Sequence, residues 1–570
     1  MGKPLIRNEI VGGLPVIKYY TDRLKIVEMI DRILPRASQG VASHGECVLA
    51  LLISVLQGDH RLCFVEKKLK DVDLVQLFGR TGLETSHFND TRLGATLDAL
   101  YANTAKIYGS IISSAIREFQ IRPKRFHVDT TSVILRGVYD VLEVVPALRL
   151  APPMPAQGFS KDHRPDLMQL MFGMVNSDEG IPIMGRFENG NSADTELFRK
   201  YMHDLAGMLD DLRSWNAVLV GDSKLCTFET IAQATQLDFP LITMLPETFS
   251  LRSELIEKAS IDPDLPLLLE TEDGEKYRGK SFKIPYLIEN KGAAPTHVWL
   301  RGLAVHSTQL QKKKAESRDR AIAAEAKDLT ALIKRLSAVE FACKADAEKI
   351  AAKEWKAARP RYHAMSLTVT QETVPVTKRK PGRPKKGETH ETTQAAVWKV
   401  MLQTSLVPRE ARPFDPDGFF VLVTSVTDKR RKSDAELLEA YKGQQVVETS
   451  FKWMKGPLAT APVFLELPSR IQSLGFVLLL ALLFAALLQR DARGAVKKRG
   501  GKVPNYSGRR SDMPTWQGIL ELFDDIRSTT VSIAGKLHRV FHNLDADQIE
   551  ILTLLGIPDL YEIYSTTVYN

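Results

Sequence analysis

Residues 125–135 read RFHVDTTSVIL, and this stretch decides the fold because hydrophobic periodicity changes here from that of helices to that of strands. Two further short runs of strand character follow at residues 167–176 and 181–189, separated by polar or Gly- and Pro-bearing turns. Three neighbouring strands are therefore expected at the start of a sheet.

A helix and two more strands continue the pattern. Ser192 or Asp194 can cap a helix with an apolar stripe, and strands are predicted at residues 217–223 and 239–245. The residues of the stripe are Leu197, Tyr201, Leu205 and Leu209. Strands and helices in this order predict a mixed α/β sheet, to which a strand at residues 419–426 returns after a long interruption.

Outside the sheet, most of the chain is expected to be helical. Residues 1–120 contain a capping box at Ser43 and Glu46 and a capping Asn89. Residues 496–570 are expected to be helical again, with a box at Asp545 and Gln548.

The interruption between the two parts of the sheet has its own pattern. Strands are predicted at residues 281–289 and 297–306, and a single long helix at about 311–359. The expected domains are a helical region at 1–120, a core at 121–250 and 415–495, an insertion at 251–414 and a helical region at 496–570.

Composition fits a soluble, multidomain protein. The chain has 570 residues, of which 44% are hydrophobic and 26% charged, and its four cysteines form no metal or disulfide pattern, so we expect a reducing cytosol. No signal peptide is expected at the first residues. The apolar run at 475–488 is shorter than the about 20 residues of a membrane span, which favours a buried core helix.

Positive charge is concentrated in one segment. Residues 378–386 read KRKPGRPKK, whereas the whole chain carries only 77 basic against 69 acidic residues. A focal basic cluster without an amphipathic anchor indicates a nucleic-acid partner rather than a membrane.

Three acidic residues form the candidate site. Asp129 and Asp222 lie in or at the ends of predicted strands, where α/β sheets gather functional groups. Glu448 shares one face of a predicted helix with Tyr441 and Lys455, seven residues away on either side. Each acid has a plainer interpretation: a strand-end Asp can cap the next turn, and Glu448 can belong to a solvated helix face.

These motifs resemble the DDE transposases of bacterial insertion sequences, in the branch with a Tyr-Arg-Glu-Lys signature. The resemblance is carried by HVDTTS around Asp129, LVGDS at Asp222, and Tyr441 through Glu448 to Lys455. It extends over residues 158–175, 180–198 and 461–482, and Gln444 stands where the signature has Arg. It implies an RNase H-like core split by the insertion, with helical regions at both ends of the chain.

The resemblance also implies the chemistry. Asp129, Asp222 and Glu448 would be catalytic and would hold two Mg²⁺ or Mn²⁺ ions, which suit clustered carboxylates. Residues 441, 444 and 455 would contact DNA. Further contacts are possible from the basic loop of Lys161, His163 and Arg164. Lys380, Arg383 and Lys385 lie in a segment that resembles an AT-hook, although a flexible linker fits equally well.

The expected protein is a bacterial, cytoplasmic and nucleoid-associated transposase. It would bind the ends of its element, cleave there and join 3′ ends to target DNA, as a dimer on two DNA ends. The alternative is a transposase-derived DNA-binding protein without catalysis. An ATP-driven DNA motor is disfavoured because the sequence has no phosphate-binding P-loop motif.

Overall fold

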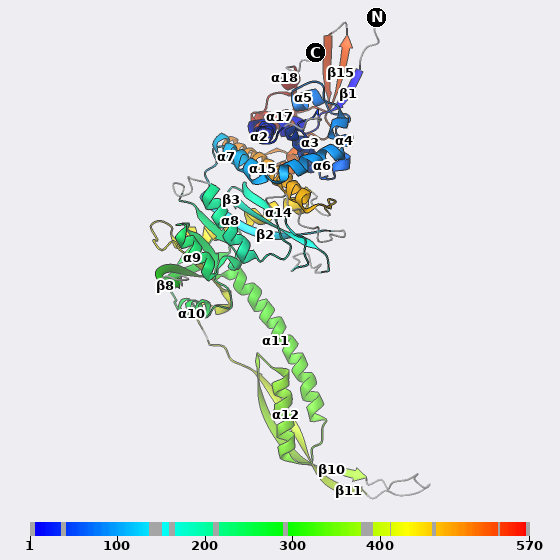
Figure 1. The fold of residues 1–570 in the computed structure, drawn as a ribbon. Helices are drawn as coiled ribbons and strands as arrows, with labels where there is room; N and C mark the ends of the chain where they lie inside the picture. The colour runs from blue at the N-terminus through cyan, green and yellow to red at the C-terminus, as the bar shows by residue number, and fades with distance from the viewer. Residues whose placement is uncertain are drawn as a thin grey trace, which may run out of the picture. The chain divides into compact units, whose positions relative to one another are not determined.

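The computed structural model describes ten stretches of the chain: residues 6–35, 41–135, 151–158, 166–208, 216–288, 295–377, 392–410, 412–458, 463–533 and 536–565 (Figure 1). They form two compact units. Unit 1 contains residues 1–246, 283–302 and 422–570, and unit 2 contains residues 247–282 and 303–421.

A large mixed sheet dominates the fold, in the strand order β4-β3-β2-β5-β6-β12-β9-β8-β7. Its strands are β2 (Arg125–Ile134), β3 (Gln169–Ser177), β4 (Pro182–Glu188), β5 (Val218–Gly221), β6 (Leu241–Met244), β7 (Leu267–Glu270), β8 (Lys276–Ile288), β9 (Thr296–Ser307) and β12 (Phe419–Thr424). β2, β3 and β4 pair antiparallel, β2, β5 and β6 pair parallel, and β12 pairs antiparallel with β6. The predicted α/β class and the strands of the sheet's core are confirmed.

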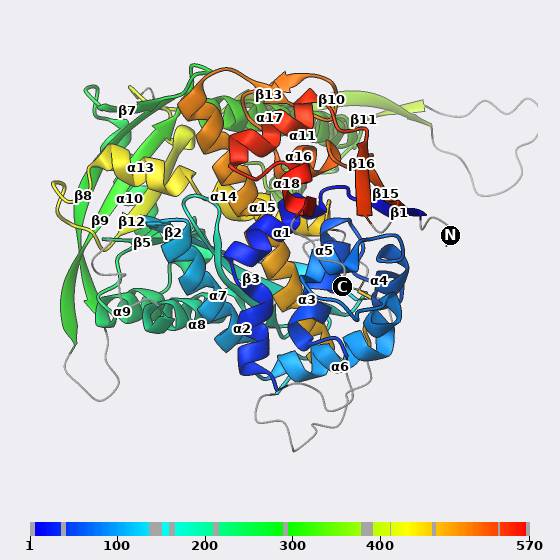
Figure 2. The ribbon, with the colours of Figure 1, turned by 90° about the horizontal axis from the view of Figure 1, so that it is seen from above.

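Helices cover both faces of the sheet in unit 1. Figure 2 shows α8 (Asp194–Met208) and α9 (Phe228–Gln236) on one side, and α13 (Asp434–Lys442) and α14 (Gln445–Lys455) on the other. The predicted stripe on α8 is buried at Leu197, Tyr201 and Leu205. The Tyr201 ring fills the space above Gly173 of β3, where an added Cβ would lie 2.4 Å from ring atoms.

The N-terminal part of unit 1 is a helical assembly. Its helices are α1 (Leu14–Arg23), α2 (Ile26–Ile33), α3 (His44–Leu56), α4 (Leu62–Lys68), α5 (Leu74–Phe78), α6 (Asp90–Tyr101) and α7 (Thr104–Glu118). The predicted capping box begins α3, because Glu46 N donates to Ser43 Oγ and Ser43 N donates to a Glu46 carboxylate oxygen. Asn89 caps α6 as predicted.

Helix α15 (Pro468–Arg499) is the apolar helix of the core. It contacts β4 and helices α3, α6 and α14, and 94% of its most apolar 18-residue window is buried inside the protein. The helix continues beyond the apolar run and, among the described residues, is long and apolar enough to span a membrane, so the length argument was wrong. The predicted buried core helix is what the structure shows.

The C-terminal region corrects one prediction. Residues 496–570 were expected to be helical, and they do contain α16 (Trp516–Glu521), α17 (Ala546–Leu555) and α18 (Leu560–Ser565). They also contain the short pair β13 (Val503–Pro504) and β14 (Arg510–Ser511), and a hairpin of β15 (Arg527–Ile533) and β16 (Lys536–His542). β-branched residues fill β15, and β1 (Ile6–Ile10) pairs with it.

Unit 2 corrects another prediction. The single long helix expected at 311–359 is two helices, α11 (Thr308–Ser337) and α12 (Lys344–Ala358). The break is at Phe341, whose backbone N–H and C=O pair with Trp398 at 2.9 and 2.8 Å. Phe341 and Leu336 join a small core with Val400 and Leu402, so tertiary pairing overrides the helical stripe.

Trp398 belongs to a long β-ribbon in unit 2. β10 (His363–Thr377) pairs antiparallel with β11 (Thr392–Leu406), and Thr377 is opposite Thr392. α10 (Ser250–Ser260) completes the helices of this unit. The basic segment 378–386 lies outside the described residues, between the paired ends of the two strands.

Candidate active site

Asp129 lies in the middle of β2, and Asp222 directly follows the carboxyl end of the parallel neighbouring strand β5. In the register of β2 and β5, Phe126 is opposite Leu219 and His127 is opposite Val220. The parallel pairing ends at His127 and Val220, and Asp129 and Asp222 each follow that last pair by two residues on their own segments. Two acids that are far apart in the sequence therefore come from neighbouring strands in the interior of the sheet.

Local hydrogen bonds orient both carboxylates. Asp129 Oδ1 accepts from Thr130 N at 2.7 Å, and Asp222 Oδ1 accepts from Lys224 N at 2.9 Å. The second bond caps the short 3₁₀ turn Ser223–Leu225, so the plainer interpretation of Asp222 as a capping residue is correct. Both side chains remain partly exposed and can meet a ligand.

A lysine lies among the acids. Lys224 forms an ion pair with Asp194, the first residue of α8, which also accepts from the Thr130 hydroxyl. Burial disfavours the Lys224 ammonium, but the Asp194 hydrogen bond and the charges of Asp194, Asp222 and Asp129 outweigh it and raise the Lys224 pKa. The Lys224 ammonium group is therefore held as a cation next to Asp129, Asp194 and Asp222.

The helix that carries Glu448 differs from the prediction. One continuous helix was expected through residues 441, 444, 448 and 455, but the chain forms α13 and α14 with a break at Gly443. The break is a tightened turn, in which Val446 N donates to Gly443 O. Tyr441 therefore ends α13, whereas Glu448 is in the first turn of α14.

The backbone at Gly443 passes close to the sheet. A Cβ at this position would lie 3.3 Å from two ring atoms of the buried His127. Burial, and secondly the charge of Arg125, lower the pKa of His127 to about 3, so this ring is neutral.

Helix α14 covers the sheet face that carries Asp129. Side chains two residues apart on a strand share a face, so Asp129 is on the side of His127. Asn176, the cross-strand partner of His127, donates to Ser450 of α14 at 2.6 Å. Glu448, two residues before Ser450, lies about 200° further round the helix, and its side chain is exposed.

Tyr441 links the third acid to the second. Burial comes first among the causes that raise the Tyr441 pKa to about 12, and the charges of Asp222 and Glu448 add to it. The phenol is therefore within electrostatic reach of both carboxylates. Tyr441 stays a neutral hydrogen-bond donor at physiological pH, which suits a contact to phosphate.

The three acids are linked, but they do not form a closed cluster. The charges of Asp129 and Asp222 both raise the pKa of Lys224, and the charges of Asp222 and Glu448 both raise the pKa of Tyr441. Among the residues that the structure describes, no three His, Cys, Asp or Glu side chains are placed to hold a metal ion. The carboxylates of Asp129 and Asp222 are oxygen donors of the kind that suits a hard cation such as Mg²⁺, and Glu448 is exposed.

The other predicted contacts have mixed positions. Gln444 is the N-cap residue of α14, and Lys455 is exposed at the last turn of this helix, two turns from Glu448. Lys161, His163 and Arg164 lie outside the described residues, as do Lys380, Arg383 and Lys385. The structure therefore leaves the basic-loop and AT-hook predictions as predictions.

Sequence reasoning missed two members of the site. Asp194 was considered only as a helix cap, and Lys224 was not singled out. The spacing LVGDSK does place a cation two residues after Asp222, and an acid that begins the preceding helix was its natural partner.

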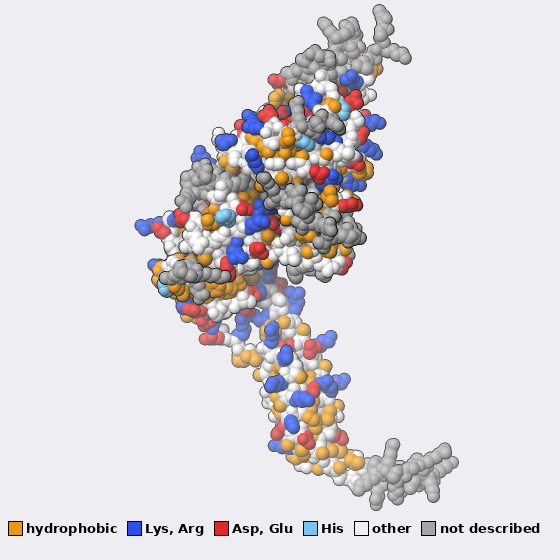
Figure 3. All heavy atoms as spheres, viewed as in Figure 1, with side chains coloured by type: hydrophobic (Ala, Val, Ile, Leu, Met, Phe, Trp, Pro, Cys, Tyr) orange, Lys and Arg blue, Asp and Glu red, His pale blue; other side chains and the backbone are white. Residues whose placement is uncertain are grey.

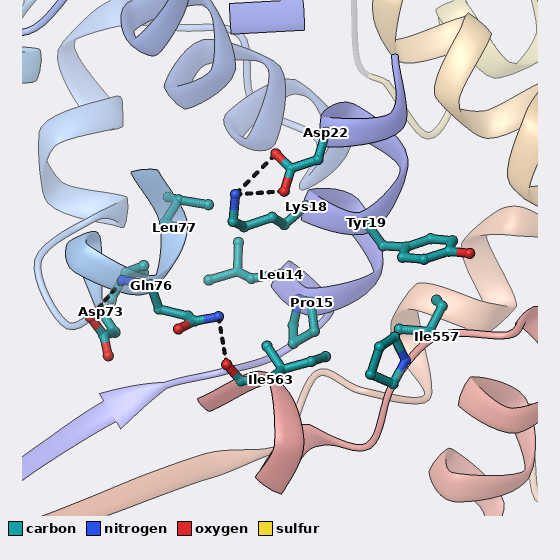
Figure 4. A pocket seen from close by; sticks show the side chains of 12 residues that line it. Leu14, Pro15, Lys18, Tyr19, Asp22, Asp73, Gln76, Leu77, Ile557 and Ile563 are labelled. Carbon is teal, nitrogen blue, oxygen red and sulfur yellow. Dashed lines mark hydrogen bonds and ion pairs between the residues drawn. The ribbon is translucent and has the colours of Figure 1, made fainter. Parts of the chain in front are cut away.

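A separate cavity lies away from the acids in unit 1 (Figure 4). It has a volume of about 260 Å³ and is bounded by α1, α5 and the C-terminal segment. Its lining includes Leu14, Leu77 and Ile557, and the ion pair of Lys18 with Asp22 at 2.7 Å. None of the predicted site residues lines it.

Comparison with known proteins gives one match. Residues 6–113 match a family described as a domain of unknown function, DUF4277, which is found in transposase-like proteins. The matched range covers β1 and helices α1–α6 and extends into α7, outside the sheet that carries the acids. No curated protein matches the chain.

Proposed function

We propose that this protein is a metal-dependent DNA transposase of the DDE type, with an RNase H-like core. The observation that carries the proposal is that Asp129 on β2 and Asp222 after the parallel strand β5 both act on Lys224, while Asp222 and Glu448 both act on Tyr441. The mixed sheet and the match of the N-terminal region to a domain of transposase-like proteins support it.

Each residue has a role in this proposal. Asp129 and Asp222 form the fixed part of a divalent-cation site, and Glu448 completes it when α14 meets DNA. Tyr441 donates to a phosphate oxygen. Bound Mg²⁺ or Mn²⁺ would activate the attacking oxygen and stabilise the leaving one in phosphodiester cleavage and strand transfer.

Double-stranded DNA is the proposed partner, as element ends and as target, bound by a dimer. Lys455, exposed in the last turn of α14, would contact DNA near the scissile phosphate. The basic segment 378–386 supplies further positive charge within unit 2.

A cleavage assay tests the proposal. The full chain is incubated with labelled duplexes that span the DNA on each side of its own coding sequence, with Mg²⁺, with Mn²⁺ or with EDTA. We expect strand cleavage at discrete positions with either metal and none with EDTA. Specific binding without metal-dependent cleavage would instead support the catalytically silent alternative, which the Lys224 ammonium among the acids also fits.

Lys224 provides a prediction about metal binding. Replacing it with Met removes the cation that lies among Asp194, Asp222 and Asp129, so a divalent cation meets less repulsion and more unscreened negative charge. We expect Mn²⁺ to raise the melting temperature of Lys224→Met by more than it raises that of the parent. Thermal denaturation with and without Mn²⁺ measures this, and an equal rise in both proteins contradicts it.

A further inference from the structure

Residues 492–511 form a basic surface that the resemblance did not include. The stretch contains seven basic residues and no acidic one: Arg493, Lys497, Lys498, Arg499, Lys502, Arg509 and Arg510. It comprises the last turns of α15 and the short β13–β14 pair, all within unit 1. We call it the basic hairpin.

Two arginines anchor the basic hairpin to the protein. Arg499 and Arg510 both pair with Glu550 of α17, at 2.8 and 2.7 Å. Arg510 also donates to Lys502 O at 2.9 Å. Gly500 and Gly501, with φ of 76° and 83°, turn the chain sharply out of α15. These ion pairs hold the basic hairpin against α17 and do not involve its other cations.

The remaining exposed cations are not neutralised. Lys497, Lys498, Lys502 and Arg509 are exposed, and within the described part of the chain none has an acidic partner within 4.0 Å. On the face drawn in Figure 3, by contrast, Lys and Arg side chains are mixed with Asp and Glu. Four exposed cations without acidic partners on this one short segment create a local positive potential.

The basic hairpin is connected to the helix of the third acid. Trp516 begins α16, shortly after β14, and its ring meets that of Trp453 on α14 at 6.2 Å between centroids. The basic hairpin is therefore followed in the chain by α16, which packs on α14, the helix that carries Glu448.

We propose that the basic hairpin binds the phosphate backbone of double-stranded DNA. Phosphates are the anions that exposed Lys and Arg side chains neutralise on DNA, and such contacts carry no sequence information. The exposed ring of Tyr506, at 62%, lies between the cations and can contact sugar or groove edges. This inference rests on the proposed function only for the choice of DNA as the polyanion.

Salt-dependent binding tests the inference. Affinity of the full chain for a short fluorescent duplex of random sequence is measured by anisotropy in EDTA, between about 50 and 200 mM salt. The test variant changes Lys497, Lys498, Lys502 and Arg509 to Gln. Each lost phosphate contact lowers the slope of log K against log salt by about 0.9, so we expect a slope flatter by about 2 to 4.

A matched variant controls for net charge. Lys258, Lys276, Lys280 and Lys399 are ion-paired at 2.6, 3.5, 2.9 and 2.9 Å, and their change to Gln removes the same formal charge. The slope should stay at the parental value. The single variants Lys502→Gln and Arg509→Gln, each flatter by about 0.9, keep the test valid if the fourfold variant fails to fold.

Two outcomes overturn the inference. One is an unchanged slope in a test variant that melts at the parental temperature. The other is loss of binding to phosphatidylserine vesicles with duplex binding unchanged, which would assign the surface to a membrane. Because EDTA prevents cleavage, this binding test does not depend on catalysis. A protein that never cleaves DNA can still bind the duplex through the basic hairpin. A protein that does cleave DNA can still show an unchanged salt dependence in the test variant, which would overturn this inference alone.

Discussion

Cleavage of terminal DNA is expected to fall by orders of magnitude when Glu448 is replaced with Gln. The substitution keeps size and helix packing but removes the charge that completes a divalent-cation site with Asp129 and Asp222. Glu448 is exposed in the first turn of α14 and has no role in the core, so folding and binding of the DNA ends should be retained. Cleavage rates and duplex affinity, measured with Mg²⁺ on the same preparations, separate the two effects.

The matched control is Glu439→Gln. Glu439 is also exposed and lies on α13, one helix before the site, so the same chemical change occurs without touching the acids. Glu436 is less suitable because its carboxylate accepts from Ser433 N at 2.7 Å and caps α13. If Glu448→Gln cleaves at the parental rate, the third acid is misassigned and the proposed site must be rebuilt.

A loss of about 3 to 5 kcal/mol of stability is expected for Arg539→Met. Arg539 is 11% exposed and pairs with Glu9 of β1 at 3.0 Å and with Asp73 at 2.8 Å. Methionine fills similar volume but removes the cation that pairs with the buried Asp73 and the partly buried Glu9. Urea denaturation of both proteins at neutral pH measures the difference. Arg430→Met is the control. The Arg430 side chain is 93% exposed and pairs with Asp428, so this variant should unfold like the parent.

The stability deficit of Arg539→Met should shrink in acid. Burial, and next the charge of Asp73, already raise the Glu9 pKa above its usual 4.5 in the parent. A carboxyl group with a raised folded-state pKa binds its proton more tightly in the native protein, so its unfavourable contribution grows as pH rises through the window above 4.5. Removing Arg539 enlarges this term. A deficit that is the same at pH 4 and pH 7 would contradict the assignment of the loss to charge.

Strands of the sheet could be predicted because their signal is local. Runs such as RFHVDTTSVIL are apolar, β-branched and bounded by turns, and β2 follows the predicted range almost residue for residue. Capping boxes were predictable for the same reason, since Ser43 and Glu46 interact within four residues. The positions of Asp129 within a strand and of Asp222 at the end of one were predictable for the same reason.

Other features depend on contacts that a single stretch does not encode. At the break, Gly443 lies against the ring of His127, which is more than 300 residues earlier in the chain. The break at Phe341 reflects pairing with Trp398, and β15 is ordered by β1 at the other end of the chain. Helical periodicity continued through both breaks in the sequence, so tertiary contacts decided against it.

The pairing of β1 with β15 has a consequence for biosynthesis. Asn8 and Thr529 are hydrogen-bonded although they are 521 residues apart. At about 5 to 20 residues per second, the ribosome completes the partner strand roughly half a minute to two minutes after β1 has emerged. During that time the first strand has an open edge. A chain released before residue 527 therefore keeps β1 without its partner strand, and we expect such truncated copies to be more susceptible to proteolysis than the full chain.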